Sequence, residues 1–135
     1  MTLNPPPPTD PTLRGIRFGS RRFSEPIPFM SALAIPAPGI YVILILPNIW
    51  ASPRQYRPLY IGESSNVGQR VTDQHEKFGS WIREAAGSKL YVAYHLTGLM
   101  TDQLRKDAEC ELIAEYNPPC NIRISSLFEA FLRSK

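Results

Sequence analysis

The chain has 135 residues, which is enough for one domain with a modest core. Its formal net charge is only +3, and residues 39–135 carry 11 basic against 10 acidic side chains. Charge alone therefore indicates a nucleic-acid partner only weakly. The apolar run Ile40–Leu46 is too short to span a bilayer, which argues against a membrane protein.

Cys110 and Cys120 form no recognisable zinc pattern, because His75 and His95 lie far from them in the sequence. The N-terminus is proline-rich rather than apolar, unlike a signal peptide. We therefore expect two reduced thiols in a cytoplasmic protein.

Prolines dominate the start of the chain. Residues 1–13 contain Pro5–Pro8 and Pro11 and are expected to form a disordered or polyproline tail. Residues 14–38 are an N-terminal extension in which Arg14–Phe18 alternates like a short edge strand. The following Arg21–Phe23 places basic residues beside an aromatic ring, which suits either a nucleic-acid contact or a solvated turn.

Two strands are predicted next. Ile40–Leu46 is apolar on both faces, as in a central strand, and Leu59–Ile61 is expected to pair back on it antiparallel. The intervening Pro47–Pro58 is long for a hairpin loop. It serves either substrate recognition or packing.

A helix is predicted from Asn66 to about Glu76, capped by Asn66. Its expected buried stripe is Val67, Val71 and Phe78, flanked by Arg70 on one side and His75 on the other.

The remaining elements follow from the same patterns. A short helix around Trp81 should end near Gly87, and Lys89–Leu96 is strand-like. Thr101 should cap a helix over Asp102–Tyr116. Residues 125–135 are predicted to form a C-terminal helix.

Three glutamates lie on the predicted helix 102–116. An apolar arc covers about half of its surface, and it contains the following residues: Leu104, Ala108, Leu112, Ile113 and Tyr116. Glu109 falls inside this arc, whereas Glu111 and Glu115 fall at its edge and reach water. A carboxylate that faces inward must be paired, for example with Arg70, or bind a metal.

The stretch Leu59–Arg70 reads as a strand, a tight exit at Gly62 and a helix start. It brings the phenol of Tyr60 and the guanidinium of Arg70 to one turn, an arrangement that suits a bound phosphate.

Five sequence features in order resemble the GIY-YIG nuclease family. They are Gly39-Ile40-Tyr41, Tyr60-Ile61-Gly62, Arg70, Glu109 and Asn121, and the resemblance covers roughly residues 39–121. It implies an α+β fold with a small antiparallel three-stranded sheet flanked by helices. The nuclease-like domain would then span residues 39–124.

The resemblance also implies a metal-dependent endonuclease that hydrolyses phosphodiester bonds in DNA. Glu109 would bind one Mg²⁺ or Mn²⁺ ion, and Arg70 would stabilise charge on the phosphate. Tyr41 and Tyr60 would orient the attacking water, with Tyr41 favoured as general base, and Asn121 would brace the site. The alternatives are a catalytically silent nucleic-acid-binding module and a nuclease that acts as an antibacterial effector.

One position departs from the family pattern. Many members have a histidine four residues after the arginine, where this chain has Gln74, and His75 follows one residue later. On a regular helix that shift turns the imidazole by about 100°. His75 is therefore expected to point away from Arg70 if the helix stays regular through Glu76, which makes its place among the catalytic residues doubtful. A helix that ends early would instead turn His75 back toward Tyr60 and Arg70.

Overall fold

A computed structural model describes residues 9–10, 15–50 and 55–121. The expected tail lies outside these residues except for Thr9–Asp10, and so does the expected C-terminal helix. Within the described residues, none of the helices has the length and apolar character needed to cross a bilayer.

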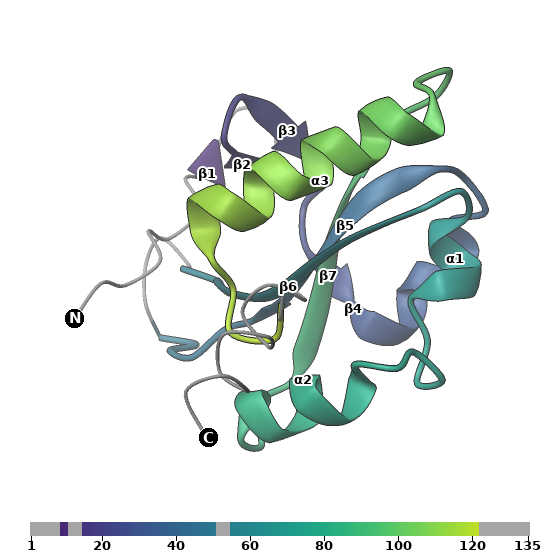
Figure 1. The fold of residues 1–135 in the computed structure, drawn as a ribbon. Helices are drawn as coiled ribbons and strands as arrows, with labels where there is room; N and C mark the ends of the chain where they lie inside the picture. Colours follow the sequence, from purple (N-terminus) through teal and green to yellow (C-terminus); the bar gives the residue numbers. More distant parts are fainter. Residues whose placement is uncertain (1–8, 11–14, 51–54, 122–135) are drawn as a thin grey trace, which may run out of the picture.

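The main sheet is antiparallel and contains four strands in the order β4-β7-β5-β6 (Figure 1). Their bounds are β4, Ile27–Pro28; β5, Gly39–Ile45; β6, Arg57–Ser64; and β7, Leu90–Leu96. The prediction of three strands was therefore wrong by one. The extra strand pairs Ile27 with Val92 on the outer side of β7. Pro28 is tolerated there because an edge strand does not need its missing N–H.

A second sheet has the order β1-β2-β3 and lies in the N-terminal extension. It consists of β1, Thr9–Asp10; β2, Gly15–Phe18; and β3, Arg21–Phe23. Gly19 has a φ of +62° in the β2–β3 turn, a conformation that glycine adopts without strain. The predicted edge strand is thus the central strand of this sheet, and Arg21–Phe23 is a strand rather than a turn.

A short 3₁₀ helix, η1 (Phe29–Ala34), precedes β5 and contacts α1 (Val67–Arg70). The Gly68 amide donates to the Ile35 carbonyl oxygen at 2.8 Å. A Cβ at Gly68 would lie 3.0–3.1 Å from three carbonyl oxygens of this segment, so a glycine permits the close approach.

The helices α2 (Phe78–Ala85) and α3 (Asp102–Tyr116) agree with the prediction, including the Thr101 cap. In contrast, α1 ends at Arg70 rather than near Glu76. The Thr72 hydroxyl oxygen accepts a hydrogen bond from the Gln74 amide at 3.1 Å. Such local side-chain bonds compete with helical ones, which explains why the helix stops.

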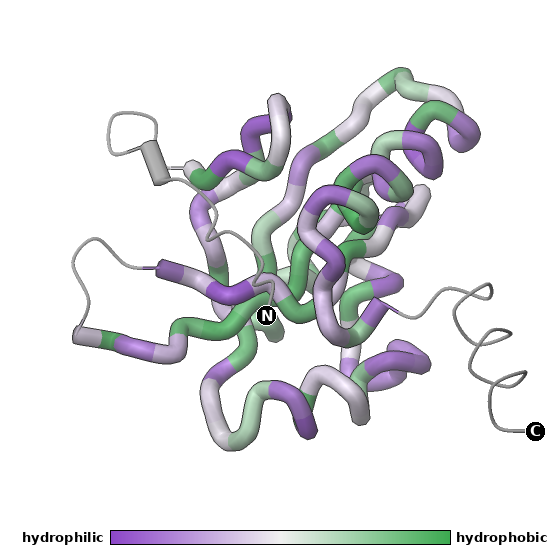
Figure 2. The backbone as a smooth tube through the Cα atoms, turned by 60° about the vertical axis from the view of Figure 1, so that its left-hand side comes forward, coloured by the Kyte–Doolittle hydropathy of each residue, from purple (hydrophilic) through white to green (hydrophobic). Residues whose placement is uncertain are grey.

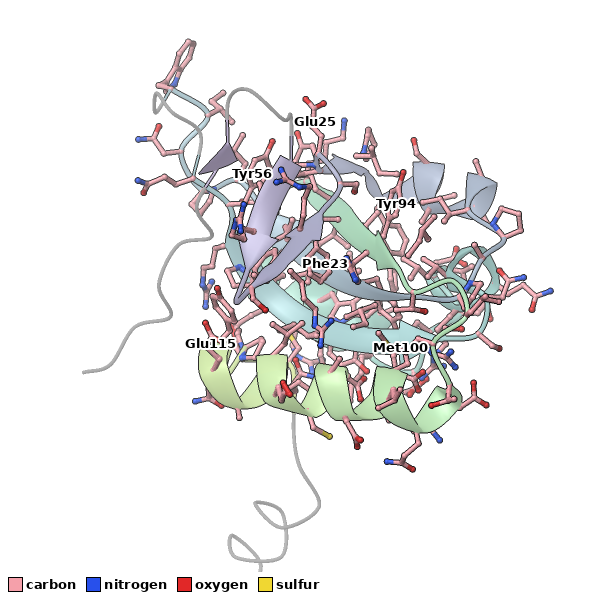
Figure 3. All side chains as sticks on the ribbon, turned by 90° about the horizontal axis from the view of Figure 1, so that it is seen from above. Phe23, Glu25, Tyr56, Tyr94, Met100 and Glu115 are labelled. Carbon is pink, nitrogen blue, oxygen red and sulfur yellow. The ribbon has the colours of Figure 1, made fainter. Side chains whose placement is uncertain are left out.

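The core has two layers, one on each face of the main sheet. The helices α1 and α2 and η1 cover one face, whereas α3 and the β2–β3 hairpin cover the other (Figure 1). Viewed from above, the β2–β3 hairpin, which carries Phe23, lies beside α3 (Figure 3). Glu115 marks one end of α3, and Met100 lies just before its other end. The most hydrophobic segments lie along the strands between these layers (Figure 2).

Candidate active site

Two tyrosines of adjacent strands form the floor of the candidate site. Tyr41 on β5 lies directly opposite Gly62 on β6, and the rings of Tyr41 and Tyr60 are 6.2 Å apart. A Cβ at position 62 would overlap the Tyr41 hydroxyl group. Gly62 therefore leaves the space that the Tyr41 ring occupies.

Burial raises the pKa of both phenols. The pKa of Tyr60 rises to about 12, and that of Tyr41 rises further, because Tyr41 is more deeply buried. The nearby Arg70 acts in the opposite direction on both. Both side chains are thus neutral phenols at pH 7 in the free protein.

His75 bonds directly to Tyr41, so the prediction that it points away was wrong. Its Nε2 lies 3.0 Å from the Tyr41 hydroxyl oxygen, and the imidazole packs against the buried Trp81 ring, with the ring centres 4.4 Å apart and the planes tilted by 42°. The early end of α1 allows the following turn to bring the ring back toward the sheet. Gln74, the residue at the family's histidine position, is exposed instead.

The hydrogen bonds of His75 define its protonation. Burial, followed by the charge of Arg70, lowers its pKa to about 4, so the ring is neutral at pH 7. Nδ1 accepts a hydrogen bond from the Lys77 amide at 3.0 Å, which leaves the single proton on Nε2. The imidazole therefore donates to the Tyr41 oxygen and does not take a proton from it.

Arg70 lies at the end of α1, and Nη2 donates to Glu76 Oε2 at 2.6 Å. This bond lowers the pKa of Glu76 to about 2. The positive charge of Arg70 also acts on Tyr41, whose pKa it lowers against the larger effect of burial. Arg70 thus connects the tyrosine pair with the solvent-exposed rim of the site.

Glu109 on α3 is half-buried, whereas Glu111 and Glu115 are exposed. Burial, followed by the negative charge of Glu63, raises the pKa of Glu109 to about 7. The Glu109 carboxylate in turn raises the pKa of both tyrosines. The negative charge of Glu109 thus acts on both tyrosines of the candidate site.

The buried face of α3 differs from the predicted apolar arc near the start of the helix. Leu104 was expected to be buried but is 55% exposed, and Arg105 is buried in its place. Arg105 can be buried because its guanidinium bonds both Glu63 and Asp102 at 2.7 Å. The carboxylate that pairs with a buried arginine is thus Glu63, which bonds Arg105. None of the ion pairs between described residues involves Glu109.

Asn121 lies against the free edge of β6. Its Oδ1 accepts from the Ile61 amide at 2.8 Å, and its Nδ2 donates to the Ile61 carbonyl oxygen at 2.9 Å. The Asn121 side chain thus hydrogen-bonds both the N–H and the carbonyl oxygen of Ile61, the residue between Tyr60 and Gly62.

Sequence reasoning missed three contributors to this site: Glu63, Glu76 and Trp81. The Glu63–Arg105 pair joins residues 42 positions apart, so local periodicity carries no signal for it. Trp81 was assigned to an apolar helix face, but its contact with His75 depends on the turn between α1 and α2.

No family model matches the chain, and no curated protein matches it. Solved structures of the GIY-YIG N-terminal endonuclease domain of UvrC from Thermotoga maritima do match. A point mutant bound to its catalytic divalent cation is 26% identical, with a TM-score of 0.46, covering 69% of this chain and 92% of that one.

A second point mutant of the same domain is 22% identical, with a TM-score of 0.47. The domain bound to magnesium is also 22% identical, with a TM-score of 0.46, and both matches cover 70% of this chain and 96% of theirs. These structures are GIY-YIG endonuclease domains, the family that the motifs of this sequence resemble.

Proposed function

We propose that this chain is a GIY-YIG-type, metal-dependent endonuclease that hydrolyses phosphodiester bonds in DNA. The main support is the contact between Tyr41 and His75 in the same site as Tyr60, Arg70 and Glu109. A phosphate needs a planar cation and positioned hydroxyls, and these side chains supply both. The silent-module alternative would have no need for a buried histidine that donates to a tyrosine oxygen.

Glu109 fits the proposed divalent metal. A half-buried carboxylate with a raised pKa lacks a strong cationic partner, which a metal ion would supply. Within the described residues, no three metal-binding side chains gather at one point. A single carboxylate suits Mg²⁺ or Mn²⁺, because Mg²⁺ keeps several waters and shares phosphate oxygens. The bound ion would polarise the phosphate and stabilise the leaving oxygen.

The other side chains take roles that follow from their contacts. Arg70 binds the phosphate and neutralises the charge that develops on it. His75 donates a hydrogen bond to the Tyr41 oxygen and the charge of Arg70 lowers the pKa of Tyr41, so both favour the phenolate over the neutral phenol. We assign Tyr41 and Tyr60 to orient the attacking water; Tyr41 acts as general base only as the phenolate, after its own proton has passed to solvent. Asn121 holds the β6 backbone between Tyr60 and Gly62.

The proposed nuclease unit spans residues 39–124, and the described part of the extension, residues 15–38, packs on both faces of its sheet. Cys110 and Cys120 are both free thiols.

Metal dependence tests the proposed function directly. The purified protein should nick or cut plasmid DNA with Mg²⁺ or Mn²⁺ and should be inactive in EDTA, because one carboxylate alone cannot stabilise the leaving oxygen. Gel electrophoresis of supercoiled plasmid measures this. Cleavage that persists at full rate in EDTA would contradict the proposed role of the metal.

Replacing His75 tests its proposed role beside Tyr41. His75→Ala removes the donor to Tyr41, and hydrogen bonds to charged groups contribute about 1.5–3 kcal/mol. The cleavage rate should therefore fall roughly ten- to hundredfold. His95→Ala is the matched control, since His95 bonds the Arg22 carbonyl oxygen on the hairpin instead. An equal and small effect of both substitutions would remove His75 from the site.

A further inference from the structure

The proposed phosphate ligand Arg70 is already bound to an anion in the free protein. Glu76 Oε2 accepts from its Nη2 at 2.6 Å, and the Glu76 side chain is 59% exposed. A carboxylate oxygen offers the guanidinium the same chemistry as a phosphate oxygen. The position that a substrate phosphate would take is thus filled by the protein itself.

The exposure of this ion pair makes it easy to displace. Solvent-exposed pairs contribute little to stability, because water and salt screen them. A DNA phosphate brought in by several backbone contacts has the larger combined attraction for Arg70. Glu76 can swing into solvent when the phosphate arrives, since its carboxylate is on the rim of the site.

Glu76 is not needed to hold the neighbouring His75. The imidazole is already positioned by Tyr41, by the Lys77 amide and by the Trp81 ring. Glu76 Oε1 lies 3.7 Å from Nδ1 of a neutral ring, so it forms no ion pair with His75. The side chain that Glu76 bonds directly is Arg70, and its charge also raises the pKa of Tyr60.

We propose that Glu76 is an internal competitor that occupies Arg70 until a substrate phosphate displaces it, and so limits the affinity for DNA. This inference rests on the proposed function of Arg70. It makes Glu76 an affinity-determining residue rather than a catalytic one. Its removal should strengthen binding and lower KM while kcat remains.

The test measures binding of a fluorescein-labelled DNA duplex in EDTA, where no cleavage occurs, by fluorescence anisotropy near 0.15 M salt. Glu76→Gln should lower Kd about three- to tenfold, as expected for removing one opposing charge at close range. Asp73→Asn is the matched control, because it removes one exposed carboxylate from the same turn. Screening should keep its effect below about twofold.

A second pair of variants asks whether the gain acts through Arg70. In an Arg70→Gln background, Glu76→Gln should have no larger effect than Asp73→Asn. Equal Kd values for Glu76→Gln and Asp73→Asn in the otherwise unchanged protein would overturn the proposal. So would a loss of kcat by more than about tenfold in Glu76→Gln with Mg²⁺, since Glu76 would then position Arg70. Failure of the proposed function is separate: the unaltered protein itself would not cleave plasmid DNA with Mg²⁺.

Discussion

Glu109→Gln should abolish DNA cleavage while the protein still folds. The substitution keeps the size of the side chain but removes the proposed ligand of the divalent ion. Metal ions contribute several kcal/mol of charge stabilisation in phosphoryl chemistry, so we expect a loss of roughly a thousandfold or more. Plasmid cleavage with Mg²⁺ measures the rate, and circular dichroism checks the fold.

The control for this prediction is Glu111→Gln on the same helix. Glu111 is exposed, so its replacement should leave the rate nearly unchanged. Comparable losses from both substitutions would show that a general effect on α3, rather than the site, is responsible.

Arg70→Ala should reduce cleavage by about a hundred- to a thousandfold, as is typical when a preorganised charge stabiliser is removed. The variant should remain folded, because the Arg70 side chain is 39% exposed and its ion pair with Glu76 lies at the surface. Single-turnover cleavage separates this effect from weaker binding.

Arg70→Lys should recover little of the lost rate. A lysine keeps the charge but lacks the planar fork that would bind two phosphate oxygens at once. A rate like that of the unaltered protein in either Arg70 variant would exclude Arg70 as the phosphate ligand.

Much of the fold is encoded locally and is therefore readable from the sequence. The helix α3 begins at the predicted Thr101 cap and ends before Pro118, because caps and prolines act within one turn. The same periodicity distinguished the half-buried Glu109 from the exposed Glu111. The strands β5 and β7 were predicted from their apolar pattern for the same reason.

Other features depend on contacts between distant segments. Arg105 replaces Leu104 in the buried face of α3, because Glu63 from β6 neutralises it. The fourth strand forms because β7 has a free edge that Ile27–Pro28 can pair with. The residues next to Arg105 do not predict its pairing with Glu63, and those next to Ile27–Pro28 do not predict the pairing with β7.

The position of His75 also depends on contacts between distant segments that the local sequence does not predict. Helical periodicity carried the predicted helix through to Glu76 and turned the imidazole away from the site. The chain instead leaves the helix after Arg70, where a Thr72 side-chain bond replaces a helical one. The sequence by itself determined which side chains the chain offers for the proposed phosphate chemistry. The tertiary structure decided that His75 lies beside Tyr41, because Tyr41 and Trp81 on separate elements contact the ring that the turn brings back.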